Sequence, residues 1–157
     1  MPSRPDPLGP EGARFWASLD ALVASATLII DRPCGSAHPR FPAFLYPLDY
    51  GYLEGTSACD GGGIDVWVGS LQPREVVGVL ACADLAKRDA EIKILLGCSR
   101  EEALLALRTH NTGPQGATLI WRAAPCCDLA RGDNPGERRQ APPAPESTED
   151  SGSDGRP

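Results

Sequence analysis

Residues 46–70 carry the side chains of this chain that are best suited to phosphate or metal chemistry. The segment reads YPLDYGYLEGTSACDGGGIDVWVGS, with three tyrosines in residues 46–52 and then Asp60 and Asp65 around consecutive glycines. Carboxylates held by a tight turn can ligate a hard cation, and glycines permit the positive φ angles and close approach that such a turn needs. The alternative is a solvated acid-glycine turn, with the tyrosines serving packing.

A second group of charged residues lies in and before an apolar run further along the chain. Asp84 and Asp89 precede the run 90–96, within which Glu91 and Lys93 are two positions apart. Side chains at positions i and i+2 of a strand point to the same face. Glu91 and Lys93 therefore form either a functional acid-base pair or an exposed surface pair, and their spacing alone allows both.

The composition limits the class of protein. The 157 residues carry a net charge of −6, which argues against a nucleic-acid-binding surface. Six cysteines without a C-x-x-C pair or a secretory leader favour reduced thiols in the cytoplasm over a zinc site or a disulfide scaffold. No run of about 18 apolar residues could span a membrane. We therefore expect a cytoplasmic protein that binds neither nucleic acid nor membranes.

One folded domain is predicted, over residues 13–127. Residues 1–12 are rich in proline and glycine and carry no apolar period, so we expect a disordered N-terminal tail. Residues 128–157 are acidic, rich in proline and glycine and poor in large apolar side chains. Such a segment cannot bury enough apolar surface to order itself, and we expect a disordered C-terminal tail.

Apolar periodicity predicts helices over 14–25 and 99–109, the second starting with an S-x-x-E capping box made by Ser99 and Glu102. Strand-length apolar runs are predicted at 27–30, 64–68, 76–83, 90–96 and 118–122. This order of elements favours the α+β class, with a small closed or partly closed β-barrel.

The phrase in residues 46–70 resembles the signature region of the soluble family I inorganic pyrophosphatases. Residues 46–52, Y-P-L-D-Y-G-Y, match the Y-P-x-x-Y-G-Y of that family. Residues 60–66, D-G-G-G-I-D-V, match its D-G-D-x-x-D-V, except that Gly62 stands in place of the middle acid. The resemblance covers about residues 27–122.

Two further pieces follow in the order that the family has. Residues 77–80, V-G-V-L, and then Asp84 match its V-G-V-L-x-x-x-D, and residues 91–94, E-I-K-I, match its D-x-K-[IL]. The turn between these pieces is about two residues longer here. Asp89 therefore competes with Glu91 for the same metal-binding role.

Several positions depart from the pattern of the family. Asp31 stands where the family has Glu, and Cys34 stands where many members have Lys. Arg40 lies about where the family has a phosphate-facing Lys. The hairpin arginine of the larger enzymes has no secure counterpart, because the chain runs almost directly on to residue 46; Arg40 or Arg32 can take its place. The helix that ends in a Tyr-Lys pair in the family ends here in His110 and Asn111. His110 can donate to phosphate, or it is simply a C-terminal helix residue near the negative end of the helix dipole.

The resemblance implies an OB-like five-stranded β-barrel with flanking helices and Mg²⁺-dependent hydrolysis of pyrophosphate to two phosphates. It implies two or more Mg²⁺ ions, with Mn²⁺ as an alternative, and a homo-oligomer as in many members. Two such ions can activate a water and stabilise the leaving oxygen. The implied metal ligands are Asp60, Asp65, Asp84 and Asp89 or Glu91. The implied catalytic residues are Asp65, Asp31 and Tyr50, and the implied substrate-binding residues are Arg40, Lys93 and Tyr50.

A second hypothesis is a non-enzymatic module of pyrophosphatase-like fold that binds phosphate ligands or a partner chain. Its support is that several residues which the family uses at its site are replaced here, by Gly62, Cys34, His110 and Asn111. Binding of pyrophosphate without turnover would distinguish this hypothesis from the first.

Overall fold

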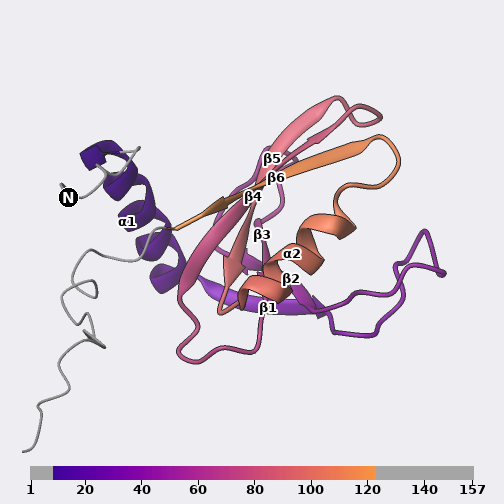
Figure 1. Cartoon of the computed structure of the whole chain (residues 1–157), viewed down its shortest axis with the longest axis horizontal. Helices are drawn as coiled ribbons and strands as arrows, with labels where there is room; N and C mark the ends of the chain where they lie inside the picture. Colours follow the sequence, from indigo (N-terminus) through magenta and orange to yellow (C-terminus); the bar gives the residue numbers. More distant parts are fainter. Residues whose placement is uncertain (1–8, 123–157) are drawn as a thin grey trace, which may run out of the picture. The chain divides into compact units, whose positions relative to one another are not determined.

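A computed structural model describes residues 9–122 of the chain, which form two helices and one six-stranded sheet (Figure 1). In chain order the elements are α1 (Gly9–Ser25), β1 (Thr27–Arg32), β2 (Asp49–Glu54), β3 (Ile64–Val68), β4 (Val76–Asp84), β5 (Asp89–Leu96), α2 (Arg100–Thr109) and β6 (Gln115–Trp121). The predicted C-terminal tail, the last residues of the predicted domain and residues 1–8 of the predicted N-terminal tail lie outside the described residues. Neither α1 nor α2 is long and apolar enough to cross a membrane.

The strands are ordered β1-β2-β3-β5-β4-β6 in the sheet. β3 and β5 run parallel, and the other neighbouring strands run antiparallel. Within residues 9–122, β1 pairs only with β2 and β6 pairs only with β4, so the sheet is open. The α+β class is confirmed. The sheet has six strands where the barrel was expected to have five, and it does not close into that barrel.

The central strands bury both of their faces, each against a different helix. In β3, Val66 and Val68 belong to a core cluster that also contains Trp16 of α1. Trp67 points to the opposite face, into a cluster that contains Ala103 of α2. Alternate residues of a strand point to opposite faces, so the apolar run of β3 supplies both layers of the core.

The helices differ in how well the sequence predicted them. α1 starts at Gly9, inside the segment that was expected to be tail. Trp16 is buried, whereas Phe15 is exposed. The capping box of α2 is confirmed, because Ser99 Oγ accepts from the backbone N–H of Glu102 and Glu102 Oε2 accepts from that of Ser99, at 3.2 and 2.8 Å. Glu102 also accepts from the N–H of Ser70 at 3.1 Å, which ties the loop after β3 to the start of α2.

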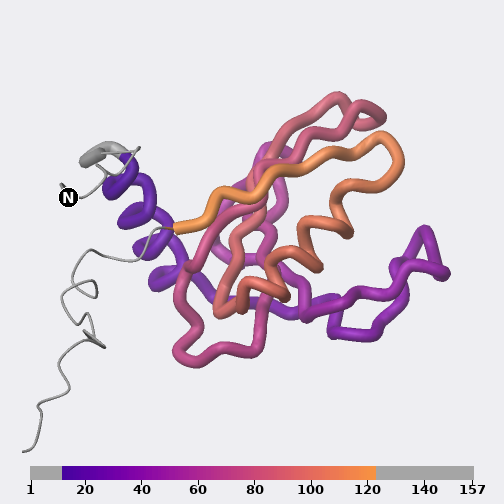
Figure 2. Tube along the Cα trace, viewed as in Figure 1, coloured from indigo at the N-terminus to yellow at the C-terminus, as the bar shows by residue number. Residues whose placement is uncertain are grey.

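A short hairpin connects β1 to β2, although the sequence was expected to run almost directly on to residue 46. Ala37 and Leu45 form a β-bridge, and the N–H of Tyr46 donates to the carbonyl of Ser36 at 2.9 Å. In Figure 2 this purple segment reaches out beyond the sheet, on the side away from α1. We call it the 36–46 hairpin; it carries Arg40 near its tip.

Gly51 of β2 is required by the close approach of β1. A Cβ at this position would overlap the carbonyl oxygen of Ile29. We expect Gly51→Ala to lower the free energy of unfolding by at least about 1–3 kcal/mol, the usual cost of overpacking a core. Urea denaturation measures this loss.

The matched control is Gly116→Ala in β6, where the nearest atom to an added Cβ is Asn111 Oδ1 at 4.0 Å. This variant should unfold at the same urea concentration as the unaltered protein. Equal stability of the two variants would contradict the close β1–β2 approach at Gly51.

Candidate active site

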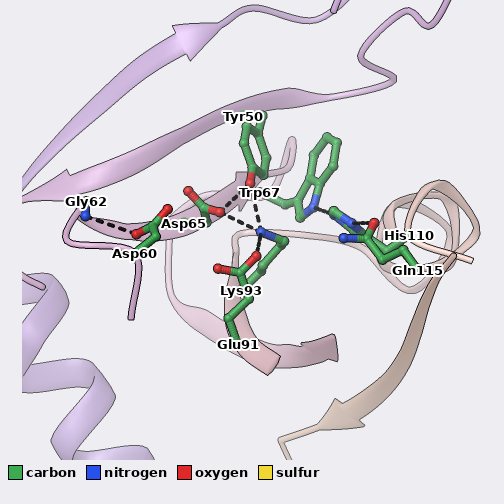
Figure 3. A network of polar contacts seen from close by, with 9 residues as sticks. All are labelled: Tyr50, Asp60, Gly62, Asp65, Trp67, Glu91, Lys93, His110 and Gln115. Atoms are coloured by element: carbon green, nitrogen blue, oxygen red, sulfur yellow. Dashed lines mark hydrogen bonds and ion pairs between the residues drawn. The ribbon is translucent and has the colours of Figure 1, made fainter. Parts of the chain in front are cut away.

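Three neighbouring strands bring four polar side chains together on the face of the sheet that carries α2. Tyr50 comes from β2, Asp65 from β3, and Glu91 and Lys93 from β5 (Figure 3). The parallel register of β3 and β5 pairs Val66 with the residue after Lys93, so Asp65 and Lys93 lie side by side. We call these four residues the Lys93 cluster.

The ammonium of Lys93 is the centre of the cluster. Its Nζ donates to Asp65 Oδ2 at 2.5 Å, to Glu91 Oε1 at 2.6 Å and to the hydroxyl of Tyr50 at 3.1 Å. That hydroxyl donates in turn to Asp65 Oδ2 at 2.6 Å. An ammonium has three donor hydrogens, so these three contacts use all of them and hold the group in one place. The predicted shared face of Glu91 and Lys93 is confirmed.

Burial sets the protonation of the cluster. Lys93 is only 3% exposed. Burial by itself would lower the pKa of Lys93, but Tyr50, Asp65 and Glu91 outweigh it, and the pKa is raised. Burial raises the pKa of the Tyr50 hydroxyl, and Asp65 adds to this shift against the opposing effect of Lys93. The cluster therefore holds a charged ammonium and a neutral phenol, and it carries one more negative than positive charge.

All four residues of the cluster line a cleft of about 640 Å³. The cleft is lined by carboxylates, by cations and by an aromatic wall that includes Phe41, Phe44 and Tyr46. Its charged lining residues are Asp60, Asp65, Asp84, Glu91, Arg40, Lys87 and Lys93. Volumes of this size are typical of sites for small ligands.

Two of the predicted metal ligands also stabilise turns at the rim of the cleft. Asp60 Oδ1 accepts from the N–H of Gly62 at 3.0 Å. Asp84 Oδ1 accepts from the N–H groups of Ala86 and Lys87 at 2.9 and 3.0 Å. Aspartate side chains commonly close turns in this way, so each carboxylate has one oxygen bound to the backbone.

Two predicted site residues lie outside the lining of the cleft. Asp31 follows the β1 pairing at Ile30, where the register shifts, and it forms an ion pair with Arg32 at 2.9 Å. Asp89 starts β5 and pairs with Asp84 across the β4–β5 turn. Of the two candidates for one metal-binding role, the structure brings Glu91, and not Asp89, into the Lys93 cluster.

Sequence reasoning missed a hydrogen-bond chain among other residues that line the cleft, Trp67, His110 and Gln115. Trp67 Nε1 donates to His110 Nε2 at 2.9 Å, and His110 Nδ1 lies 2.9 Å from Gln115 Oε1. Because an indole N–H can only donate, Nε2 must accept, and the neutral ring donates from Nδ1 to Gln115. His110 has no donor left for phosphate in this arrangement. The position of Trp67 two residues after Asp65 was the signal that placed it on this face.

The chain of contacts reaches the Lys93 cluster through aromatic packing. The ring centroids of Trp67 and Tyr50 are 4.6 Å apart, and those of Tyr46 and Tyr50 are 5.5 Å apart. Buried aromatic pairs at such distances add to stability beyond their burial. Trp67 and Tyr46 therefore orient the phenol that donates to Asp65.

No protein-family model and no curated protein matches this chain. Solved structures that are similar to it include three inorganic pyrophosphatases. That of Helicobacter pylori has a TM-score of 0.45 and 16% identity, with 60% of this chain and 81% of that chain covered. That of Coxiella burnetii has a TM-score of 0.41, 17% identity and coverages of 60% and 82%. That of Neisseria gonorrhoeae has a TM-score of 0.43, 19% identity and coverages of 60% and 80%.

The neutral state of His110 predicts a loss of stability in mild acid. Burial lowers the pKa of His110 below its usual 6.5, with Gln115 opposing the shift. The unfolded chain therefore takes up a proton at a higher pH than the folded chain, and stability falls as the pH drops below about 6.5. Between about pH 7.5 and about pH 5.5 we expect a loss of up to about 1.4 kcal/mol in the free energy of unfolding, measured in urea.

The control uses the second of the two histidines of the chain, His38. His38→Gln should keep this pH dependence, and His110→Asn should reduce it. An equal fall in stability for His110→Asn and the unaltered protein would show that His110 is not the group that titrates.

Proposed function

We propose that this protein hydrolyses inorganic pyrophosphate to two phosphates with Mg²⁺ or Mn²⁺. The observation that carries the proposal is the cleft in which Asp65 and Glu91 flank the buried ammonium of Lys93. Hydrolysis of a phosphoanhydride depends on positioning and on neutralising the charge of the phosphates. Carboxylates for a divalent cation and fixed cations for phosphate oxygens are the groups that meet this need.

The donor set of the cleft is compatible with Mg²⁺. In residues 9–122 no three His, Cys, Asp or Glu side chains gather closely enough to hold a metal ion. Mg²⁺ keeps several of its waters and usually takes only one or two carboxylates from the protein. Lys93 contacts one oxygen of Asp65 and one of Glu91, so each carboxylate has a second oxygen for such an ion. Asp65 and Glu91 would hold one such ion, and Asp60 and Asp84 line the same cleft. A bound divalent ion would supply an activated water and neutralise the leaving phosphate.

The remaining groups of the cleft would bind and orient the substrate. Arg40 is exposed near the tip of the 36–46 hairpin, and its guanidinium matches two phosphate oxygens at once. Lys93 would exchange one of its three contacts for a phosphate oxygen. Tyr50 would donate its hydroxyl hydrogen to phosphate, and Asp65 would accept the proton of the attacking water. The catalytic role of Asp31 stays a prediction. Asp31 does not belong to the residues that line the cleft.

The second candidate function, binding without turnover, is favoured by one specific observation. Gly62 has no side chain, and the neighbouring Asp60 uses one oxygen on the backbone of Gly62 itself. A module of this kind would bind pyrophosphate through Arg40 and Lys93 and release it unchanged.

The test is phosphate release from pyrophosphate by the purified full chain, with Mg²⁺ and with Mn²⁺. We expect metal-dependent release, and we expect Asp65→Asn to lower the rate by about 10²–10⁴-fold, the usual contribution of a positioned acid or base. Glu54→Gln, an exposed position at the end of β2, is the matched control and should keep the full rate.

No release above that of Asp65→Asn would contradict the proposed hydrolysis. Calorimetric titration with pyrophosphate and Mg²⁺ then tests the second candidate function. Binding of pyrophosphate without turnover favours the binding module. Absence of both binding and turnover contradicts both functions.

Gly62 is the one of the three consecutive glycines whose position can take a side chain. Gly61 has a φ of +83°, and a Cβ at Gly63 would lie 2.5 Å from the carbonyl oxygen of Leu53. A Cβ at Gly62 would meet only the movable carboxylate of Asp60, at 3.2 Å. We expect Gly62→Asp to lower the Mg²⁺ concentration needed for half-maximal activity, or to raise the rate by up to about 10²-fold.

Side-by-side Mg²⁺ titrations of the two proteins measure this effect. Gly62→Asn is the control, because asparagine has the shape of aspartate without its charge. This variant should show neither a lower Mg²⁺ requirement nor a higher rate. If Gly62→Asp abolishes an activity that the unaltered protein has, the site uses a different group to activate water.

A further inference from the structure

A second hollow of about 360 Å³ adjoins the cleft, between the tip of the 36–46 hairpin and the β4–β5 turn. It is lined by Arg32, His38, Pro39, Arg40, Phe41 and Lys87. Four of these residues, His38, Arg40, Phe41 and Lys87, also line the cleft. A ligand in the cleft can therefore extend into the hollow without leaving the protein surface.

The lining of the hollow has a different charge from that of the cleft. It contains the cations Arg32, Arg40 and Lys87, and none of its lining residues is acidic. Arg32 forms an ion pair with Asp31 in which both side chains are about one third exposed, at 34% and 39%. An exposed pair of this kind contributes little to stability, so Arg32 can exchange its partner for an anionic ligand.

The hollow has two aromatic side chains, His38 and Phe41, and the ring of His38 is hydrogen-bonded to the backbone of the hairpin. His38 Nδ1 accepts from the N–H groups of Arg40 and Phe41, at 3.1 and 3.3 Å. The centroids of the His38 and Phe41 rings are 5.2 Å apart, yet Phe41 remains 66% exposed. The exposed ring of Phe41, next to His38 and beside cations, offers a stacking surface for a planar group that carries phosphate.

We propose that the hollow is a subsite for a nucleoside monophosphate group, so that the substrate class of the cleft is a nucleoside diphosphate. The base stacks on Phe41, and Arg32, Arg40 and Lys87 bind the α-phosphate. The β-phosphate lies in the cleft at Lys93. This substrate class rests on the proposed function, because hydrolysis of a nucleoside diphosphate would use the same chemistry at the same carboxylates.

The reaction balances with water as the only co-reactant. The water oxygen forms a bond to the β-phosphorus, and the bond from that phosphorus to the bridging oxygen breaks. The bridging oxygen leaves with the nucleoside monophosphate, and the other product is phosphate. Asp65 takes the proton of the attacking water and returns it to solvent.

The first experiment measures binding and does not depend on turnover. Calorimetry with AMP and with ribose 5-phosphate compares the same phosphate with and without a base. We expect AMP to bind about 10-fold more tightly, a difference within the range of one base stacked on one aromatic ring. Phe41→Ala should remove this difference and Phe41→Tyr should keep it.

Phe15→Ala is the matched control, because Phe15 is an exposed phenylalanine of α1, at 41%, and it does not line the hollow. It should leave the affinity for AMP unchanged. Equal affinity for AMP and ribose 5-phosphate, or an AMP affinity that is the same in Phe41→Ala, would overturn the subsite.

The second experiment compares phosphate release from ADP and from pyrophosphate with Mg²⁺. We expect both to be hydrolysed, and we expect Phe41→Ala to lower kcat/KM about 10-fold more for ADP than for pyrophosphate. Hydrolysis of pyrophosphate without that of ADP overturns the substrate class and leaves the proposed function intact. If neither is hydrolysed while AMP binding depends on Phe41, the proposed function fails and the subsite is supported.

Discussion

The buried ammonium of Lys93 is the interaction on which the rest of the site depends. A charged group in the interior is stable only if its lost hydration is replaced by partners of opposite charge. Asp65 and Glu91 supply these partners from two different strands. Removing both partners would leave an uncompensated buried charge, which is far more costly than the ion pairs are stabilising. The parallel pairing of β3 and β5 and the chemistry of the cleft therefore depend on each other.

The cluster is held in turn by elements that contribute no group to it. Tyr50 donates to Asp65 and packs against Trp67, whose indole N–H donates to His110. His110 is the C-cap residue of α2 and is 8% exposed. It is bound on its other side to Gln115 at the start of β6. Because buried polar groups need partners, this chain of contacts links α2 and β6 to the orientation of the Tyr50 phenol.

The cleft and the adjoining hollow differ in the charge of the residues that line them. Carboxylates dominate at the sheet, around Asp65 and Glu91, while cations gather between the 36–46 hairpin and the β4–β5 turn. Opposite charges on neighbouring surfaces orient a ligand that carries its own metal ion at one end and an unneutralised phosphate at the other. The 36–46 hairpin is decisive for this division, since it brings Arg40 and Phe41 to the edge of the cleft.

The sequence by itself determined the local features of this protein. The capping box of α2, the strand β3 at its observed bounds and the shared face of Glu91 and Lys93 all follow from short-range periodicity and from contacts between residues close in the chain. Only the tertiary structure decided that β5 lies beside β3, that the sheet stays open, that Asp31 is outside the cleft, and that His110 is buried in a neutral state. The alternation of a strand shows which residues share a face, but it does not show which strand lies next to it, because strand pairing joins segments far apart in the chain.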